Sequence, residues 1–375
     1  MKKTIKLILF FMLIICALLI IPNISNAADT TANSEETLIS AITSASAGDT
    51  ITLQNNITVT KPIVITGEIT IDGNGYTVAG STDWTSTSGN QTMFTAQSTG
   101  AKLTLKDINL NNGPKYGVQA YDGGIVILNN VSITGFRYGG VLVNGGSLEI
   151  IDLHLGTNGT GENNGIEVDK GTAVTKNPSL TMNGTLTSDE GENVIRIPED
   201  SKVTDFTVTN TENTTNKIAV AGNVIAVTDK NDNILFESMM PDTVNPTTDE
   251  EKVILMIIAG DKHNRIAVDL GSTVTEDMLK SHIELDEGYE ITGFYTDENY
   301  TTAFDFATAL TQDTTVYAKV DAISNEEITP PAEEIPEEKD ETPKTGVKTY
   351  AGLALASIVL SGVILVSLKK RGIKE

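Results

Sequence analysis

The sequence predicts an all-β protein whose larger part is a right-handed parallel β-helix. Two observations predict this fold. From about residue 36 to residue 237, short apolar runs alternate with polar residues and are interrupted by Asn, Asp and Gly, as is typical of strands joined by tight turns. In addition, one strand pattern returns at nearly constant intervals, which indicates the stacked coils of a solenoid.

The repeat is clearest in three segments that begin at Leu103, Val126 and Leu148, which are 23 and 22 residues apart. A further copy begins at Leu180 after a longer insertion. Alternate residues of each segment would point inward and stack on their counterparts in the next coil, about 4.8 Å along the axis. A second short strand follows each segment, at residues 116–121, 138–143, 165–168 and 194–197.

A turn is predicted within each repeat, where two residues separate the apolar positions. Asp107, Asn130 and Asp152 occupy this position in successive copies. Asn and Asp tolerate left-handed backbone and form hydrogen bonds to their neighbours. We therefore expect a ladder of stacked polar side chains along the solenoid.

The first coils resemble those of a known superfamily. Residues 38–42, 47–53 and 69–75 are similar to the N-terminal cap and first coils of pectin-lyase-like β-helices. The resemblance implies a β-helix over residues 35–240, with a short helix at 37–46 that covers the open end of the stack and its strand edges. This superfamily includes lyases, glycosidases and non-enzymatic adhesins, so the resemblance does not specify an activity.

The N-terminus predicts secretion. Lys2, Lys3 and Lys6 precede an apolar stretch at residues 7–21, and Ser25-Asn26-Ala27 supplies small residues before a cut. Residues 1–27 are therefore expected to be a signal peptide that is cleaved between Ala27 and Ala28. A lipoprotein attached through Cys16 is the alternative, which the bulky Ile15 before it disfavours. Cys16 is the only cysteine, so the mature chain would have no disulfide.

The C-terminus predicts attachment to the cell envelope. Thr342-Pro343-Lys344-Thr345-Gly346 precedes an apolar run at residues 351–368 and a basic tail, all within residues 342–375. This combination resembles a Gram-positive cell-wall sorting signal. The resemblance implies that a sortase cleaves the Thr345–Gly346 bond and joins Thr345 to peptidoglycan. The apolar run, at about 1.5 Å per residue, would form a transmembrane helix and be the chain's only contact with the membrane, before sorting.

One departure from the sorting signal leaves alternatives open. The family usually has Leu where this chain has Thr342. A sortase of another class, or retention by a plain C-terminal membrane anchor, would also fit the sequence. We expect a secreted protein anchored to the Gram-positive cell wall.

A second module is predicted between the β-helix and the C-terminus. Residues 288–297 and 311–319, within residues 252–321, are similar to the internalin B-type repeat, also called the Listeria–Bacteroides repeat. The resemblance implies a small β-grasp-like spacer or protein-interaction unit, although Phe294 and Val320 replace two tryptophans of that family. Residues 322–341 are rich in Pro and Glu, which predicts an extended acidic stalk.

Charge and motif content exclude several function classes. The net charge of −24 disfavours nucleic-acid binding, because phosphate contacts require basic surfaces. Residues 72–75 (Asp-Gly-Asn-Gly) lack the later bidentate Glu of a calcium loop and predict a tight turn. We expect no cofactor and no metal site.

Catalytic residues are sparse in the predicted coils. The candidates are carboxylates, two arginines and a histidine, namely Asp107, Asp122, Asp152, Glu167, Asp169, Arg137, Arg196 and His154. Asp107 and Asp152 share a register but lie two coils apart, roughly 10 Å. We therefore assign no catalytic residue. An enzyme would require two of these carboxylates to converge within about 6 Å, beside Arg137 or Arg196.

Aromatic residues suggest a binding surface instead. Tyr116, Tyr121, Phe136, Arg137 and Tyr138 cluster around two successive second strands. Their rings could stack on sugars, and the arginine could pair with an anionic group; the alternative is lateral packing between neighbouring strands. Trp84, in the excursion at residues 81–90, could be a loop-tip contact or a local plug.

Together these features predict a cell-wall-anchored surface protein, an adhesin that contacts a polysaccharide or a host ligand without catalysis. A wall-anchored polysaccharide lyase or glycosidase acting on the flank of the β-helix is the alternative. A purely structural protein that coats the wall is a third hypothesis, which the sequence does not separate from the first.

Overall fold

The computed structural model describes residues 29–159, 165–189, 194–212, 214–248 and 251–323. These residues are almost entirely β-structure, with two helices, α2 (Glu35–Ser44) and α3 (Glu276–Ser281). The signal peptide, the sorting signal with its apolar run, and nearly all of the acidic stalk lie outside the described residues. Within the part of the chain that is described, no helix is long and apolar enough to cross a membrane.

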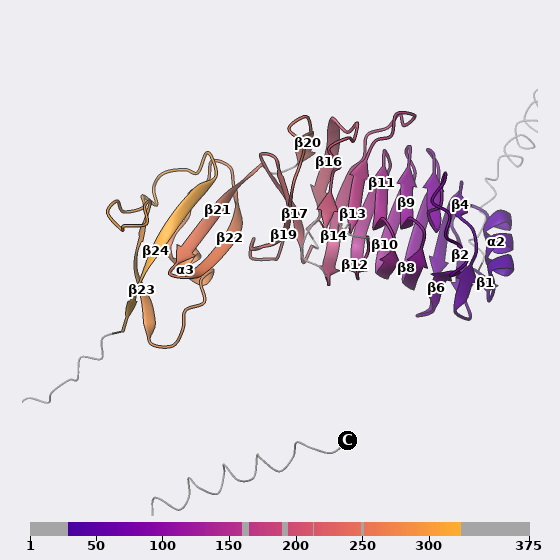
Figure 1. Ribbon diagram of the computed structural model, residues 1–375, viewed down its shortest axis with the longest axis horizontal. Coiled ribbons are helices and arrows are strands. Elements are labelled where there is room, and N and C mark those ends of the chain that lie inside the picture. Colours follow the sequence, from indigo (N-terminus) through magenta and orange to yellow (C-terminus); the bar gives the residue numbers. More distant parts are fainter. Residues whose placement is uncertain (1–28, 160–164, 190–193, 213, 249–250, 324–375) are drawn as a thin grey trace, which may run out of the picture. The chain divides into compact units, whose positions relative to one another are not determined.

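Two parallel sheets form the main body of the protein (Figure 1). The first sheet contains nine strands in one path: β1 (Asp29–Ala32), β2 (Asp49–Leu53), β5 (Glu68–Asp72), β8 (Lys102–Gly113), β10 (Ile125–Phe136), β12 (Ser147–Leu155), β14 (Ser179–Ser188), β16 (Asp205–Asn210) and β20 (Asn245–Thr248). Two short strands, β3 (Ile57–Val59) and β6 (Thr77–Gly80), pair beside β8. The second sheet contains β4 (Ile63–Ile65), β7 (Phe94–Gln97), β9 (Tyr116–Tyr121), β11 (Gly139–Asn144), β13 (Ile166–Asp169) and β15 (Ile195–Arg196).

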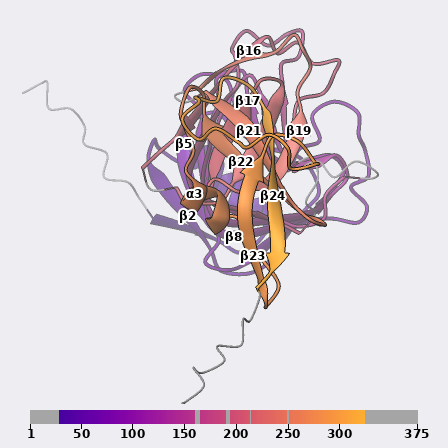
Figure 2. The same ribbon diagram turned by 90° about the vertical axis from the view of Figure 1, so that its left-hand side faces the viewer.

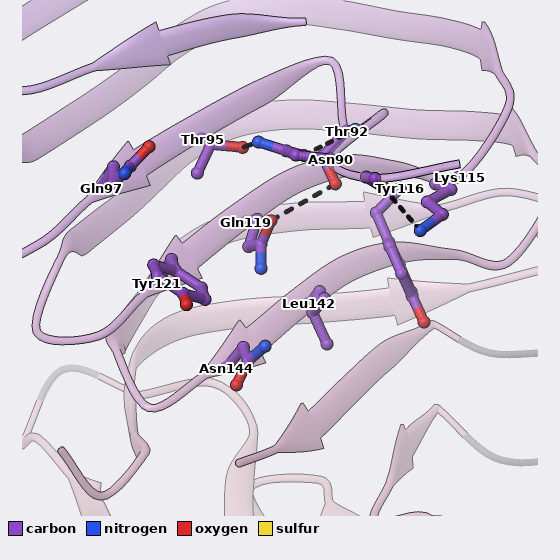
Figure 3. Close-up of a pocket in the computed structure, with 11 residues that line it drawn as sticks. Asn90, Thr92, Thr95, Gln97, Lys115, Tyr116, Gln119, Tyr121, Leu142 and Asn144 are labelled. Carbon is purple, nitrogen blue, oxygen red and sulfur yellow. Dashed lines mark hydrogen bonds between the residues drawn. The ribbon is translucent and has the colours of Figure 1, made fainter. Parts of the chain in front are cut away.

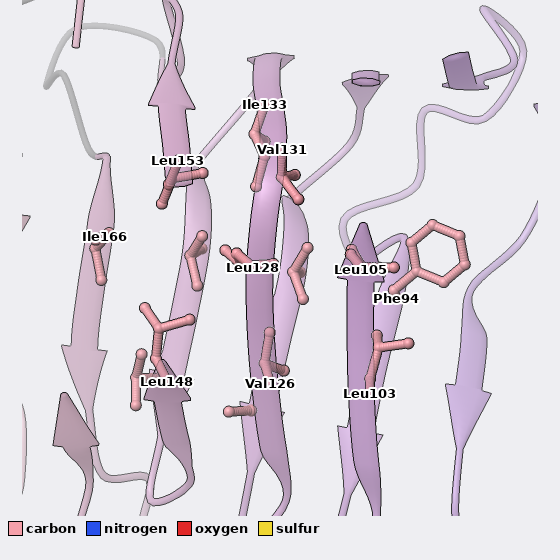
Figure 4. Packing of buried hydrophobic residues seen from close by; sticks show 14 of the residues in the cluster. Phe94, Leu103, Leu105, Val126, Leu128, Val131, Ile133, Leu148, Leu153 and Ile166 are labelled. Carbon is pink, nitrogen blue, oxygen red and sulfur yellow. The ribbon is translucent and has the colours of Figure 1, made fainter. Parts of the chain in front are cut away.

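The strand register is that of stacked coils and confirms the predicted repeat. Leu103, Val126, Leu148 and Leu180 are paired in succession across β8, β10, β12 and β14. Their side chains point into one aliphatic core, where counterparts from successive coils lie side by side (Figure 4). The chain alternates between the two sheets, which is the arrangement of a parallel β-helix. The right-handed sense of the coils stays a prediction.

The N-terminal end of the stack is covered by α2, as predicted. Ser34 caps this helix in a reciprocal arrangement with Thr37, because each side chain accepts a hydrogen bond from the other residue's backbone N–H. Leu38 and Ala41 face the main core and are buried. The Glu35 carboxylate accepts hydrogen bonds from the N–H and hydroxyl of Thr60, which attach the first turn of the helix to a coil.

Residues 217–239 differ from the prediction, which placed them in the coils of the β-helix. They form an antiparallel sheet of β17 (Lys217–Ala221), β18 (Val224–Thr228) and β19 (Ile234–Met239). Gly222-Asn223 is a two-residue turn with Gly222 at φ 55°, a conformation that favours a hairpin over a coil. Ile218 and Ile225 join the main core.

A four-stranded mixed sheet follows, with β21 (Lys252–Ala259), β22 (Lys262–Asp269), β23 (Tyr289–Tyr295) and β24 (Thr314–Ala322) in the order β22-β21-β24-β23 (Figure 2). The central strands β21 and β24 are parallel, and both outer pairs are antiparallel. The sequence predicts a β-grasp-like unit over these residues, and that assignment stays a prediction. Its separate core includes Leu279 of α3 and Phe294.

The predicted polar ladder is present at two of its three positions. Asp107 and Asn130 both have left-handed backbone, with φ of 49° and 56°, and Asn130 Nδ2 donates to Asp107 Oδ1 at 2.7 Å. This hydrogen bond and the nearby Lys106 ammonium lower the pKa of Asp107. Asp152 is different, because it is exposed at an irregularity in the pairing of β12 with β14.

A buried asparagine closes the turn at the end of β10. Asn158 is 3% exposed. Its Oδ1 accepts from the backbone N–H of Phe136 at 3.0 Å, and its Nδ2 donates to the carbonyls of Ile133 and Gly156, both at 2.9 Å. Buried backbone groups require such partners, so this one side chain stabilises a junction between coils.

Replacing Asn158 with Ala should lower the free energy of unfolding by about 1–3 kcal/mol for each buried group that loses its partner. The measurement is urea unfolding of the full chain followed by circular dichroism. The matched control is Asn129→Ala, because Asn129 is only partly buried in the neighbouring strand. Equal stability of the two variants would contradict the role assigned to Asn158.

Candidate functional site

The outward face of the second parallel sheet presents two columns of side chains at matching register. Inward neighbours such as Phe94, Val118 and Val141 occupy the core, so the alternate residues face outward. The first column is Thr95, Gln119, Leu142, Glu167 and Arg196; the second, two residues further along each strand, is Gln97, Tyr121, Asn144 and Asp169. The columns change from neutral residues on β7, β9 and β11 to charged residues on β13 and β15.

A cavity of about 430 Å³ lies on the neutral part of this face (Figure 3). Side-chain amides and tyrosines dominate its lining, and we call it the amide cavity: Gly89, Asn90, Thr92, Thr95, Gln97, Lys115, Tyr116, Gln119, Tyr121, Leu142 and Asn144. The floor comes from the two columns. One wall comes from residues 89–92, which lead into β7, and another from the start of β9.

The wall at residues 89–92 is fixed by its own hydrogen bonds. Asn90 Oδ1 accepts from the backbone N–H of Thr92, and Asn90 Nδ2 donates to Thr95 Oγ1, both at 3.1 Å. Lys115 Nζ donates to the carbonyl of Gly89 at 2.8 Å and joins the two walls. The cavity is therefore held in shape by the chain itself.

Trp84 connects the same segment, residues 89–92, to the main core. It is 7% exposed and packs in the main core. Its Nε1 donates to Gln91 Oε1 at 2.6 Å, and Gln91 Nε2 donates to the carbonyl of Ser88. Of the two roles that the sequence left open for Trp84, the local plug is the one observed.

Gln119 lies at the centre of the floor. It is 7% exposed, and its Oε1 lies 3.5 Å from the Thr92 hydroxyl, which donates to it. Beside it, Asn144 Oδ1 accepts from the backbone N–H of Gly171 at 2.9 Å. Both amides therefore have their oxygen atoms engaged by the chain.

Tyr116 connects the cavity to the charged part of the sheet. Its hydroxyl donates to Glu167 Oε1 at 2.9 Å, and its ring meets that of Tyr138 edge to face, with 6.0 Å between the centroids. Burial, reinforced by the Glu167 charge, raises the pKa of Tyr116. Burial also raises the pKa of Glu167, against the hydrogen bond from Tyr116 and the attraction of Arg196.

The predicted aromatic cluster separates into three groups. Tyr116 and Tyr121 line the amide cavity. Tyr138 lies next to Tyr116 and is 37% exposed, with Lys115 Nζ and Arg137 Cζ at 5.8 and 5.9 Å from its ring centroid. Arg137 and Tyr138 are exposed but do not belong to the cavity lining.

The prediction for Phe136 is corrected by its position in the core, where it is 1% exposed and cannot contact a ligand. The left-handed turn at Gly135, with φ 78°, precedes it. Its ring occupies the space next to Gly113, where a Cβ would lie 2.6 Å from the ring.

The amides of the floor were missed by sequence reasoning. Gln97, Gln119 and Asn144 stand in the same second strands as the tyrosines, and the alignment of the repeats already places Gln119 beside Leu142 and Tyr121 beside Asn144. The signal that could have found them is the alignment of equivalent positions in successive repeats, considered together with the aromatic residues.

The candidate carboxylates do not gather at one place. Asp107 belongs to the polar ladder of the first sheet, and Asp152 is exposed on that sheet. Asp122 accepts hydrogen bonds from the N–H and hydroxyl of Thr175 and from the N–H of Lys176, so it holds a loop. His154 contacts Thr187 and Asp189 on the first sheet.

Glu167 and Asp169 are the exception. They stand two residues apart on the outward side of β13, roughly 6.6 Å between Cα atoms, and Arg196 is paired with Glu167 on β15. Asp169 Oδ1 accepts from the Ser201 hydroxyl and from the N–H of Lys170, both at 2.7 Å. The described residues contain no group of three or more His, Cys, Asp or Glu side chains that could bind a metal ion.

Comparison with protein families gives one match. Residues 29–145 match the model of the pectate lyase-like adhesive domain. A comparison with curated proteins gave no match. The matched segment contains every lining residue of the amide cavity, whereas Glu167, Asp169 and Arg196 lie beyond it.

The raised pKa of Glu167 makes a pH-dependent contribution to stability. In the native state this carboxyl keeps its proton to higher pH than in the unfolded chain, so its contribution is full below its ordinary pKa and is lost as pH rises through the raised value. Against Glu167→Gln, which does not titrate, the wild-type protein should lose relative stability from about pH 4 upward.

The measurement is the difference in urea midpoint between the wild-type protein and the variant at several pH values. A wild-type protein that gains stability over the variant as pH rises would contradict this account, because it would mean that Arg196 holds Glu167 ionised.

Proposed function

We propose that this protein is a surface adhesin that binds glycans through the amide cavity of its β-helix, without catalysis. The observation that carries the proposal is the position of the cavity, which lies wholly within the segment that matches an adhesive domain. Its shape is fixed by internal hydrogen bonds, as is usual for binding sites that are formed before the ligand arrives.

The chemistry of the cavity suits a sugar. Side-chain amides offer both donors and acceptors to hydroxyl groups, and tyrosine rings offer an apolar face with a polar end. Thr92 and Gln97 add further polar groups to the lining. A phosphate-rich ligand is disfavoured by the net charge of −24.

We further propose that the protein is displayed on a Gram-positive cell wall. The features that support this are residues 1–27 as a signal peptide and residues 342–375 as a sorting signal. In this arrangement a sortase and peptidoglycan are its partners, the acidic residues 322–341 form a stalk, and the unit that contains β21–β24 serves as an internalin B-type spacer.

A polysaccharide lyase or glycosidase is the second candidate, and Glu167, Asp169 and Arg196 on one face favour it. Binding is preferred because both carboxylates are engaged by neighbouring side chains, Glu167 by Tyr116 and Asp169 by Ser201. A general acid or base must instead meet the substrate proton directly.

Glycan binding should depend on Tyr121. We expect Tyr121→Ala to weaken binding of the full chain on a glycan array about tenfold, which corresponds to about 1.4 kcal/mol, because a sugar face loses its aromatic contact. The control is Tyr289→Ala, since Tyr289 is 50% exposed on β23 of the four-stranded sheet. An unchanged affinity of the Tyr121 variant would contradict the assignment.

The same glycans should stay intact after incubation with the protein. Assays for reducing ends and for unsaturated sugars measure this outcome. Cleavage that disappears in the Glu167→Gln variant would instead establish the enzyme.

Anchoring should depend on the Thr345–Gly346 bond. Deleting residues 342–346 is expected to move the protein from the cell-wall fraction to the membrane fraction, because the apolar run remains while the cleavage site is lost. Fractionation with immunoblotting measures this, and Pro336→Ala in the stalk is the control. A variant that still fractionates with the wall would contradict sorting at this bond.

A further inference from the structure

The amide cavity has an unequal supply of hydrogen-bonding groups. Three of the four amide oxygens in its lining are engaged by the chain: that of Gln119 by the Thr92 hydroxyl, that of Asn144 by the N–H of Gly171, and that of Asn90 by the N–H of Thr92. Among the described residues, Gln119 Nε2 and Asn144 Nδ2 donate to no protein group. At Gln119 and Asn144 the floor therefore offers N–H donors.

These donors are available to an acceptor from a ligand. Gln119 is 7% exposed, and its side chain lines the cavity. Figure 3 shows its nitrogen directed toward Leu142 and away from Thr92. A carbonyl oxygen is the acceptor that two neighbouring amide N–H groups bind well.

An apolar surface lies between the two donors. Leu142 is paired with Gln119 on the neighbouring strand and stands two residues before Asn144 on its own strand. It is 8% exposed and belongs to the cavity lining. The Tyr121 ring, paired with Asn144, completes this apolar part. The ligand group should therefore combine a carbonyl with a small apolar substituent.

Charge selects against a carboxylate as that acceptor. Glu167 and Asp169 follow Leu142 and Asn144 in their columns on the next strand, and the chain carries a net charge of −24. The Lys115 ammonium is the cation of the lining, but it already donates to Gly89 and lies over the Tyr138 ring. An uncharged carbonyl avoids repulsion from the two carboxylates.

We propose that the amide cavity recognises the acetamido group of an N-acetylated amino sugar. The carbonyl oxygen accepts from Gln119 Nε2 and Asn144 Nδ2, the methyl group packs on Leu142, and the sugar ring contacts Tyr121. This inference rests on the proposed glycan-binding function and specifies the class of sugar.

Four trisaccharides separate the acetamido group from its alternatives. Isothermal titration of the full chain would use the trimers of N-acetylglucosamine, glucosamine, glucose and galacturonate. We expect the N-acetylated trimer to bind at least tenfold more tightly than the others. Equal binding of the glucose trimer, tightest binding of the galacturonate or glucosamine trimer, or no binding of the N-acetylated trimer would each overturn the inference.

The proposed adhesin function and the acetamido assignment are tested separately. Binding of any other glycan on the array through Tyr121 would sustain the adhesin while removing the acetamido assignment. If no glycan on the array binds, both the adhesin function and the acetamido assignment are overturned.

Two variants test the individual contacts. Gln119→Glu keeps the shape of the side chain but replaces the donating NH₂ with a carboxylate oxygen, so affinity for the N-acetylated trimer should fall at least tenfold. Gln54→Glu introduces the same charge at an exposed position as the control. Leu142→Ala should reduce the preference for the N-acetylated over the glucose trimer, because the methyl contact is lost.

Circular dichroism would show whether each variant retains the β-helix. A folded Gln119→Glu variant with wild-type affinity would overturn the assignment. Two disaccharides then distinguish sources of the group: N-acetylglucosaminyl-N-acetylmuramic acid represents bacterial envelopes, and N-acetyllactosamine represents host glycans. Binding of either supports the acetamido assignment, and binding of neither overturns it.

Discussion

The in-register stacking of inward aliphatic side chains is the constraint on which the rest of the structure depends. Leu103, Val126, Leu148 and Leu180 occupy one position in successive coils, and each is buried by its neighbours. This burial supplies the main stabilisation, because the described chain has no disulfide. Alternation along each strand then orders the outward residues as well. The columns that form the amide cavity are thus a direct consequence of the packing of the core.

The stack also needs both of its ends covered, since the last coil would otherwise expose apolar side chains and unpaired strand edges. At the N-terminal end α2 buries Leu38 on the core. After β16 the antiparallel sheet β17–β19 places Ile218 and Ile225 in the same core. The chain changes from parallel coils to a hairpin where the Gly222-Asn223 turn reverses its direction, and β20 then returns to the first parallel sheet.

Much of this could be predicted from the sequence, because a repeat of nearly constant length determines its own register. The alignment of Leu103 with Val126 and Leu148, the turn at Asp107 and Asn130, and the N-terminal helix were all predictable for that reason. The hairpin was not predicted, since its alternating apolar pattern resembles that of a coil, although Gly222-Asn223 is a hairpin signal. Phe136 was misplaced because the left-handed Gly135 before it decides which face the next side chain takes. The donors of the cavity depend on contacts between distant residues, such as Asn144 with Gly171, which no local pattern reveals.

The position of the amide cavity follows from one irregularity in an otherwise regular sheet. Thr95, Gln119 and Leu142 would form an open column, but the excursion at residues 81–90 and the Asn90–Thr95 hydrogen bond add a wall beside it. On the next two strands of the same column, the residues become Glu167 and Arg196, and the Glu167 carboxylate accepts a hydrogen bond from Tyr116. Amide N–H groups of Gln119 and Asn144 line the cavity where the wall encloses the sheet, while the carboxylates of β13 accept hydrogen bonds from the protein. A site that holds its carboxylates in internal hydrogen bonds and presents amide N–H groups is suited to retaining a glycan, whereas cleavage would require those carboxylates to be released from Tyr116 and Ser201.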